Sequence, residues 1–378
     1  MTLLKQLHLF PLLISLVVAK SVYPTPACVQ DKTCVPVTID NGSGETLYVM
    51  IYGSNTHTYF DFLKGSYSDT FSSSGSVISL DKDPKTFYLP GDGITGGARM
   101  YFSTHLFTGI PDLATYPYIF DKIEMGWSRN TAVWNTTSVD YFGMPIQLIQ
   151  GIKKIGFKDS CTRDSIMSDL TQNMGLEANL YDERFFFKSD MSLLRVFSPQ
   201  HFYTNLPNLW ESAITKGLDE LVLDDPVKGT GVYFNFNYGG TQFTHIRKLS
   251  NDSVEVLVNG QKQTITEINT GNAAAGQIKP IGNQFAGLLA ATINRGVLGN
   301  PSHWGQNGMP NTGFPEYYYQ GKPGNYLYNM YAKVLIENSI DFKTYATPYD
   351  DYWHMDSSIQ VGADNNAPVT IKILPFHG

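Results

Sequence analysis

The chain has 378 residues, of which 42% are hydrophobic and only 16% are charged, below the roughly 25% of an average domain. That length accommodates one large or two medium domains, and three cysteines are too few for a fold held mainly by disulfides. The net charge of −7 and the lack of a long basic run argue against a nucleic-acid partner.

Residues 1–19 predict a secretory signal peptide. Lys5 supplies the positive charge, an apolar stretch runs from Leu7 to Val18, and Val17-x-Ala19 offers the small residues of a cleavage site. The apolar stretch is too short to span a membrane, and no later segment holds about 18 uninterrupted apolar residues. We therefore expect a secreted protein, extracellular or in the cell wall, with no membrane partner.

Secretion brings two further expectations. Cys28 and Cys34 are close enough in sequence to form a disulfide in an exported protein. Sequons at Asn41, Asn135 and Asn251 are glycosylation acceptors if the host is eukaryotic.

Residues 35–150 predict a β domain. The segments VPVTIDN, TLYVMIYG and SVISL are short, rich in β-branched or aromatic residues, and bounded by Gly, Ser, Asn or Asp. Turn clusters such as SSSGS recur between such segments. Several short strands at this spacing favour a β-sandwich or a β-barrel.

Residues 151–340 predict a mixed α/β domain. Three sets of apolar residues at helical spacing predict three helices. The sets are Ile166, Met167, Leu170 and Met174; Phe285, Leu288, Leu289 and Ile293; and Met330, Tyr331, Val334 and Leu335. The segment SVEVLVNGQKQTITEI predicts a hairpin with a type I′ turn at Asn259-Gly260. We expect the C-terminal strands of residues 341–378 to rejoin the first domain.

The stretch YIFDKIEMGWSRNTAVWNTTSVDYFGMPI places two carboxylates, Glu124 and Asp140, in strand-like runs. Strand alternation puts Ile123 and Met125 on a core face, and Glu124 with Lys122 on the opposite face. If the two runs are antiparallel neighbours, their Cβ atoms lie about 5 Å apart when opposed and about 7–8 Å when diagonal.

Those spacings suit glycoside hydrolysis, in which two carboxyl groups flank the bond that is cleaved. Inverting enzymes need roughly 6.5–9.5 Å between the carboxyl groups, and retaining enzymes roughly 5–5.5 Å. The spacing alone therefore leaves the stereochemistry open. It also leaves open that both acids are solvated strand residues without a catalytic role.

Several ordered motifs add to this pair. Asp140 lies sixteen residues after Glu124 within NTTSVDYFG, and NMYAKVLIENSIDF and YATPYDD follow near the C-terminus. Together with LRVFSPQHF and FAGLLAATINRG, these motifs resemble glycoside hydrolase family 64, the β-1,3-glucanases, over about residues 35–378. One departure is that Met125-Gly126 follows Glu124 where the family commonly has Phe-Thr.

The resemblance implies a mainly β fold with an α/β insertion: a thaumatin-like β-barrel or sandwich domain, and a mixed α/β domain across a groove. It implies an endo-β-1,3-glucanase that hydrolyses β-1,3-glucan by inversion, with Glu124 as general acid and Asp140 as general base. We expect this enzyme to be secreted and independent of cofactors, with a monomer as the default. Apolar and aromatic neighbours around Glu124 would help it to hold a proton. The alternative is a non-catalytic glucan-binding or antifungal protein.

Five further residues are candidate sugar contacts. They are Trp134, the nearest counterpart of the family's substrate-binding Trp, and Thr137, Trp304, Asp350 and Asp351. Thr137 and the two aspartates also have simpler explanations: strand propensity for Thr137 and an Asx-type turn for Asp350 and Asp351. Trp304 lies in a Gly/Asn-rich loop and is a candidate platform in the groove. No His-x-x-x-His or Cys-x-x-Cys pair is present, so we expect no metal site.

Overall fold

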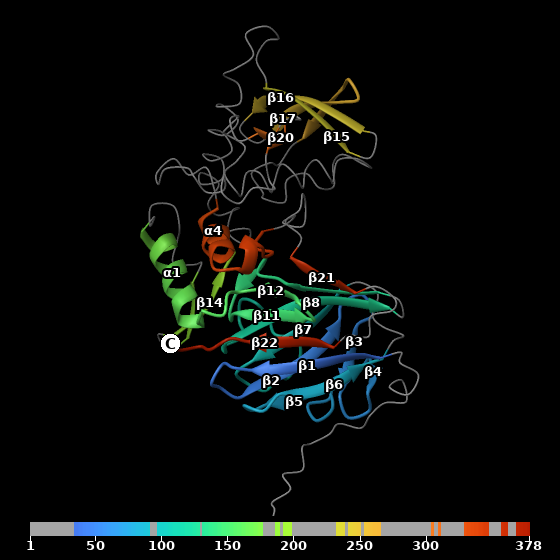
Figure 1. Cartoon of the computed structure of the whole chain (residues 1–378), viewed down its shortest axis with the longest axis vertical. Helices are drawn as coiled ribbons and strands as arrows, with labels where there is room; N and C mark the ends of the chain where they lie inside the picture. The colour runs from blue at the N-terminus through green and yellow to red at the C-terminus, as the bar shows by residue number, and fades with distance from the viewer. Residues whose placement is uncertain are drawn as a thin grey trace, which may run out of the picture.

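A five-stranded sheet and an eight-stranded sheet face each other in the computed structural model of the chain (Figure 1). The structure describes residues 34–90, 97–128, 131–176, 186–189, 192–198, 232–238, 241–250, 253–265, 304–305, 309–310, 329–347, 357–361 and 368–378. Within these ranges the fold is mainly β, as predicted, and the two large sheets are open layers of a sandwich rather than a closed barrel.

The five-stranded sheet has the order β12-β11-β22-β1-β6. Its strands are β1 (Val35–Asn41), β6 (Lys85–Leu89), β11 (Ile146–Gln150), β12 (Lys153–Gly156) and β22 (Val369–Ile373). The last strand of the chain thus lies between β1, to which it is parallel, and β11. The β11–β12 hairpin carries this sheet past residue 150, as far as Gly156.

The eight-stranded sheet has the order β21-β9-β8-β7-β2-β3-β4, and β5 also pairs with β2. Its strands are β2 (Leu47–Gly53), β3 (Thr58–Asp61), β4 (Ser66–Ser68), β5 (Val77–Leu80), β7 (Ala98–Ser103), β8 (Phe120–Ser128), β9 (Thr131–Thr136) and β21 (Ser358–Val361). Alternating residues of these strands fill the core between the sheets, among them Val49, Met100, Ile123 and Met125.

Two α-helices, a short 3₁₀ helix and a small sheet cover one end of the sandwich. They are α1 (Arg163–Leu176), α4 (Met330–Glu337), the 3₁₀ helix η8 (Ile340–Phe342), β10 (Tyr141–Phe142), β13 (Phe186–Ser189) and β14 (Ser192–Phe197). Helices α1 and α4 share a core with Phe142 and Val196, and all eight apolar residues predicted for these two helices are buried. The helix predicted around residues 285–293 lies outside the described residues.

The remaining described strands belong to the predicted mixed α/β region. They are β15 (Val232–Tyr238), β16 (Thr241–Ser250), β17 (Ser253–Val258), β18 (Gln261–Ile265), β19 (Trp304–Gly305) and β20 (Met309–Pro310). Strands β15 to β18 form one antiparallel sheet in sequence order. The turn between β17 and β18 has φ of 49° at Asn259 and 78° at Gly260, which confirms the predicted type I′ hairpin.

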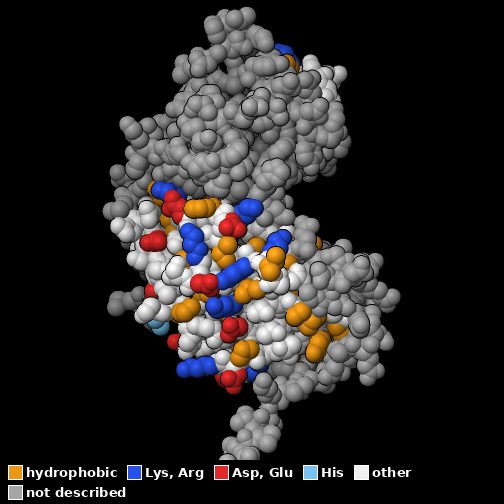
Figure 2. All heavy atoms as spheres, in the orientation of Figure 1, with side chains coloured by type: hydrophobic (Ala, Val, Ile, Leu, Met, Phe, Trp, Pro, Cys, Tyr) orange, Lys and Arg blue, Asp and Glu red, His pale blue; other side chains and the backbone are white. Residues whose placement is uncertain are grey.

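The outer face of the five-stranded sheet is polar and of mixed charge. Figure 2 shows Lys and Arg side chains interspersed with Asp and Glu side chains over the described part of this face. Lys154 and Lys372 both pair with Asp159 there. No helix in the described ranges is both long enough and apolar enough to cross a membrane.

Asn41 and Cys34, for which the sequence predicts a glycan and a disulfide, both lie among the described residues. The Asn41 side chain is buried, and its Nδ2 donates to the carbonyls of Glu45 (2.8 Å) and Leu80 (3.1 Å). The nitrogen that a glycan requires is therefore engaged inside the protein, and the predicted glycosylation of Asn41 is wrong. Cys34 is disulfide-bonded. Its pairing with Cys28 stays a prediction, because Cys28 lies outside the described residues.

Candidate active site

A row of polar side chains crosses the outer face of the eight-stranded sheet. Ile123 and Met125 point into the sandwich core, so Glu124 between them points outward, as alternation predicts. Glu124 lies opposite Arg99 on β7 and opposite Asn135 on β9. Polar groups of three neighbouring strands are therefore brought together on the face turned away from the sandwich core, part of which is covered by a second buried cluster that includes Met50, Tyr101 and Phe120.

Asp140 joins this face through an ion pair with Lys122. Lys122 precedes Glu124 by two residues and shares its side of β8, and its Nζ contacts Asp140 Oδ2. The Lys122 side chain is only 5% exposed and the Asp140 side chain 31%. The ammonium also lies 5.7 Å from the ring centroid of Tyr141. A lysine this buried needs an anionic partner, and its charge in turn favours the ionised form of Asp140.

Arg99 lies beside Glu124 and is also influenced by the charge of Asp140. Its Nε lies 3.6 Å from Glu124 Oε1, and both side chains are about 40% exposed. Burial lowers the pKa of Arg99, but hydrogen bonding to Tyr101 and the charges of Glu124 and Asp140 outweigh burial and raise it. Burial raises the pKa of Tyr101. The charge and hydrogen bond of Arg99 lower this pKa, and the charges of Asp140 and Glu124 raise it further. Glu124 and Asp140 thus act electrostatically on the same two side chains.

The backbone of the Asp140 segment is fixed from three sides. The Ser198 N–H, just after β14, donates to the Asp140 carbonyl at 2.9 Å. The Tyr331 hydroxyl on α4 donates to the Ser138 carbonyl at 2.6 Å, and the Ser138 N–H donates to the Tyr345 carbonyl at 2.7 Å. Residues about 60 to 200 positions further along the chain therefore position the Asp140 bend.

We expect Tyr331→Phe to lower kcat about tenfold with little change in KM, because the Asp140 bend loses a buried tether while the surface of the site is unchanged. The lost hydrogen bond should cost about 1 kcal/mol of unfolding free energy. Steady-state kinetics and urea unfolding measure the two effects. Tyr88→Phe on β6, in the other sheet, is the matched control, and equal kcat values for the two variants would contradict this role of Tyr331.

Behind the face, Asp121 ties β8 to the segment after β10. Its carboxylate accepts hydrogen bonds from the N–H groups of Lys122 (2.7 Å), Gly143 (2.7 Å) and Met144 (2.8 Å). Burial raises the pKa of Asp121 to about 7, against the opposing effect of these hydrogen bonds and of the Lys122 charge. Asp121 is inaccessible to substrate, so we assign it a structural role.

Gly143 allows this close approach. A Cβ on Gly143 would lie 2.0 Å from the Phe120 carbonyl oxygen. We expect Gly143→Ala to lower the unfolding free energy by about 2–3 kcal/mol, because the backbone must shift. In the control Gly151→Ala, the added Cβ meets nothing within 4 Å and only its φ of +57° adds strain, about 1 kcal/mol. Thermal unfolding compares the two, and an equal loss would contradict the steric argument.

Arg195 holds the loop that precedes β8. The side chain is fully buried and donates to the carbonyls of Leu113 (2.9 Å), Tyr118 (3.0 Å) and Tyr116. Its guanidinium lies over the ring of Phe120, 4.5 Å from the centroid. Burial lowers the pKa of Arg195 to about 10, so it stays charged at neutral pH. The loop that precedes β8, beside the candidate site, is therefore anchored by the Arg195 side chain.

Among the described residues no three His, Cys, Asp or Glu side chains are grouped as a metal site would require. What the geometry offers is a pair of solvent-accessible carboxylates on one sheet face, each beside its own cation. A model of the β-1,3-glucanase family, glycoside hydrolase 64, matches residues 111–373, more than half of the chain and including both carboxylates. The chain belongs to glycoside hydrolase family 64.

Solved family 64 structures share the fold. A laminaripentaose-producing β-1,3-glucanase in complex with laminaritetraose is 18% identical, with a TM-score of 0.69 over 91% of this chain and 99% of the other. The family 64 domain from Clostridium beijerinckii is 19% identical, with a TM-score of 0.61 over 90% and 98%. The laminaripentaose-producing enzyme from Paenibacillus barengoltzii, complexed with laminarihexaose, is 19% identical, with a TM-score of 0.53 over 95% and 78%. No curated protein sequence matches the chain.

Two expectations about the family 64 site need correction. Asp140 does not lie in a strand opposite Glu124; it occupies a bend between β9 and β10, and Asn135 takes the position opposite Glu124. Glu124 is not enclosed by apolar groups either, since its side chain is 40% exposed and Arg99 is its neighbour.

The predicted sugar-binding role of Trp134 is wrong. Trp134 lies opposite Met125 on the inner face of the sheet, and its side chain is fully buried in the sandwich core. A ring without exposed area has no face for a sugar to contact. Val133, the preceding residue, points to the outer face and is exposed. At this place in β9 the side chain on the outer face is therefore a valine and not a tryptophan.

The other candidate contacts remain predictions. Thr137 is buried and forms a parallel bridge with Tyr345 directly after β9, which gives its backbone a structural role. Asp350 and Asp351 lie outside the described residues, and of Trp304 only the backbone is described.

The two remaining sequons also stay predictions. Asn251 lies outside the described residues. A glycan on Asn135 would be attached directly beside Glu124, its cross-strand neighbour, and would cover the carboxylate.

Three residues at this site were missed as functional candidates: Lys122, Arg99 and Tyr101. Alternation already placed Lys122 on the face of Glu124, so an ion pair with Asp140 could have been proposed from sequence. Arg99 and Tyr101 gave no such signal, because their place beside β8 depends on a pairing of strands that are distant in sequence.

Proposed function

We propose that this family 64 chain is a secreted, monomeric endo-β-1,3-glucanase whose substrate lies across the outer face of the eight-stranded sheet. The observation that carries the proposal is that Glu124 and Asp140 share one accessible face and both act on Arg99 and Tyr101. We also infer that the sandwich is the thaumatin-like domain and that the mixed α/β region forms the second wall of a groove. The fold shared with enzymes crystallised with laminari-oligosaccharides supports both inferences.

In this proposal the reaction is a single displacement. Glu124 donates its proton to the glycosidic oxygen while the bond to the anomeric carbon breaks. A water molecule attacks that carbon from the opposite side and loses a proton to Asp140, which gives inversion.

The placement of Lys122 supports the choice of inversion. Lys122 and Glu124 are two residues apart on an extended strand, about 7 Å. Because Lys122 contacts Asp140, we propose a separation of at least that order for the two carboxyl groups. Inverting glycosidases need roughly 6.5–9.5 Å, which leaves room for the attacking water.

The release of reducing ends from laminarin tests the activity directly. We expect the purified protein to produce a series of oligosaccharides from laminarin, as an endo-acting enzyme does, and none from a β-1,4-glucan. A protein that sediments with insoluble β-1,3-glucan and releases no reducing ends would overturn the catalytic proposal. That outcome would favour the non-catalytic glucan-binding alternative.

A further inference from the structure

A cluster of aromatic side chains continues the row of Glu124 across the outer face of the sheet. Strand pairing places Glu124 opposite Arg99, Arg99 opposite Tyr52 on β2, and Tyr52 opposite Tyr59 on β3. Phe71, in the loop after β4, completes the cluster. With about 4.8 Å between neighbouring strands, Tyr59 lies about 14 Å from Glu124, the length of a few sugar units.

The cluster is a connected surface. The rings of Tyr52 and Tyr59 are 5.0 Å apart, and those of Tyr59 and Phe71 are 5.3 Å apart in an edge-on arrangement. Tyr52, Tyr59 and Phe71 pack against the buried cluster that includes Met50, Tyr101 and Phe120, and each of the three residues remains partly exposed. The Tyr52 hydroxyl is hydrogen-bonded to Nδ1 of the exposed His57 at 2.9 Å, which adds polar groups at the edge of the aromatic surface.

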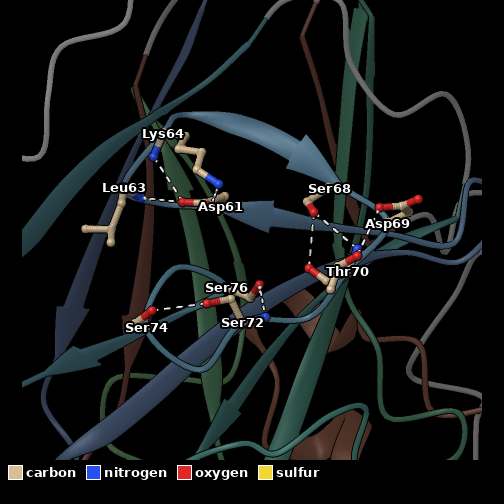
Figure 3. Close-up of polar contacts among 9 residues, drawn as sticks. All are labelled: Asp61, Leu63, Lys64, Ser68, Asp69, Thr70, Ser72, Ser74 and Ser76. Atoms are coloured by element: carbon tan, nitrogen blue, oxygen red, sulfur yellow. Dashed lines mark hydrogen bonds and ion pairs between the residues drawn. The ribbon is translucent and has the colours of Figure 1, made fainter.

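Local hydrogen bonds fix the segments that carry these rings (Figure 3). The Asp61 carboxylate accepts from the N–H groups of Leu63 and Lys64 and closes the β3–β4 turn. On the Phe71 loop, the Ser72 N–H donates to the Ser76 hydroxyl at 3.1 Å. The backbone segments next to Tyr59 and Phe71 are therefore held in place before any ligand binds, which lowers the entropy cost of binding.

We propose that Tyr52, Tyr59 and Phe71, with His57 at their edge, form a sugar-binding platform that holds the glucan chain on one side of the cleavage point. A sugar ring presents an apolar face of C–H groups and an equatorial rim of hydroxyl groups. Partly exposed aromatic rings bind the first, and the Tyr52–His57 pair and Arg99 bind the second. The inference rests on the proposed function, because the occupant is the same β-1,3-glucan chain that reaches Glu124.

Binding measured without catalysis tests the platform. In the Glu124→Gln background, we expect Tyr59→Leu and Phe71→Ala each to weaken the apparent Kd for insoluble linear β-1,3-glucan about tenfold, as loss of an aromatic anchor does. Tyr59→Leu preserves apolar packing, so the loss would reflect the missing ring, and Tyr59→Phe should restore most of the affinity. Phe342→Ala, which removes an exposed ring on η8, is the control.

Equal binding by Tyr59→Leu, Phe71→Ala and Phe342→Ala would overturn the platform. In the active protein, the two platform variants should raise KM for laminarin about tenfold and raise KM far less for the shortest substrate cleaved. An equal rise for both substrates would also contradict the proposal. Failure of the parent protein to hydrolyse laminarin would instead count against the proposed function, since the binding assay does not depend on cleavage.

Discussion

Glu124→Gln and Asp140→Asn are each expected to lower kcat for laminarin hydrolysis by about 10²–10⁴-fold, the usual contribution of one general acid or base. Each substitution keeps the shape of the side chain and removes the proton transfer. KM should change little, because neither side chain carries most of the contact with the polysaccharide. Reducing-end release at saturating laminarin measures the effect.

Two controls make this result specific. Glu337→Gln on α4 and Asp83→Asn in the β5–β6 turn remove exposed carboxylates away from the face of Glu124, and we expect both to keep wild-type kcat. Circular dichroism and thermal unfolding should show that all four variants are folded. If either Glu124→Gln or Asp140→Asn retains more than about a tenth of wild-type kcat while folded, that residue is not the acid or base that we propose.

Lys122→Met is expected to lower kcat/KM about 10²-fold at mildly acidic pH and to move the acidic limb of the pH profile to higher pH. The ammonium contacts Asp140 and favours its carboxylate form, so without Lys122 the base takes up a proton at higher pH and is lost sooner as the pH falls. A pH profile of kcat/KM separates this electrostatic effect from a general loss of activity.

Lys154→Met is the matched control for Lys122→Met. Lys154 also pairs with an aspartate, Asp159, but on the outer face of the other sheet, so its loss should leave the pH profile unchanged. A Lys122→Met protein with the wild-type acidic limb would contradict the view that this lysine sets the ionisation of the base. A uniform fall in kcat/KM at every pH would point to a structural role only.

Local sequence patterns were sufficient where neighbours in sequence decide the structure. The helical spacing of Ile166 to Met174 predicted α1, and the Asn259-Gly260 pair predicted a type I′ turn, because only residues that tolerate positive φ fit there. Alternation in β8 placed Glu124 outside and Ile123 inside. In each case the information lies within a few residues.

The site itself depended on contacts between distant parts of the chain. The local sequence predicts a strand at Asp140, but hydrogen bonds from the Tyr331 hydroxyl and the Ser198 N–H hold this segment as a bend. No local pattern links these positions. The cation beside Glu124 is likewise set by the pairing of β7 with β8, so its polar environment was not predictable from the apolar residues around it in sequence.

The errors at Trp134 and Asn41 have a common physical cause. A motif names residue types, but burial decides what those residues do. Strand alternation places Trp134 on the inner face of the sheet and its neighbour Asn135 on the outer face. The side-chain amide of Asn41 forms hydrogen bonds that close the turn after β1. Side-chain direction and hydrogen bonding, rather than residue identity, distinguish a surface group from a core group.

We propose that Glu124 and Asp140 stand far enough apart on one sheet face for a water molecule to lie between them during cleavage. Proton NMR of the first product released from a laminari-oligosaccharide tests this most directly, before the anomers equilibrate. We expect the new reducing end to form first as the α-anomer, the inverted product of a β-linkage. Initial release of the β-anomer would contradict it, because retention requires a covalent intermediate and a closer pair of carboxylates.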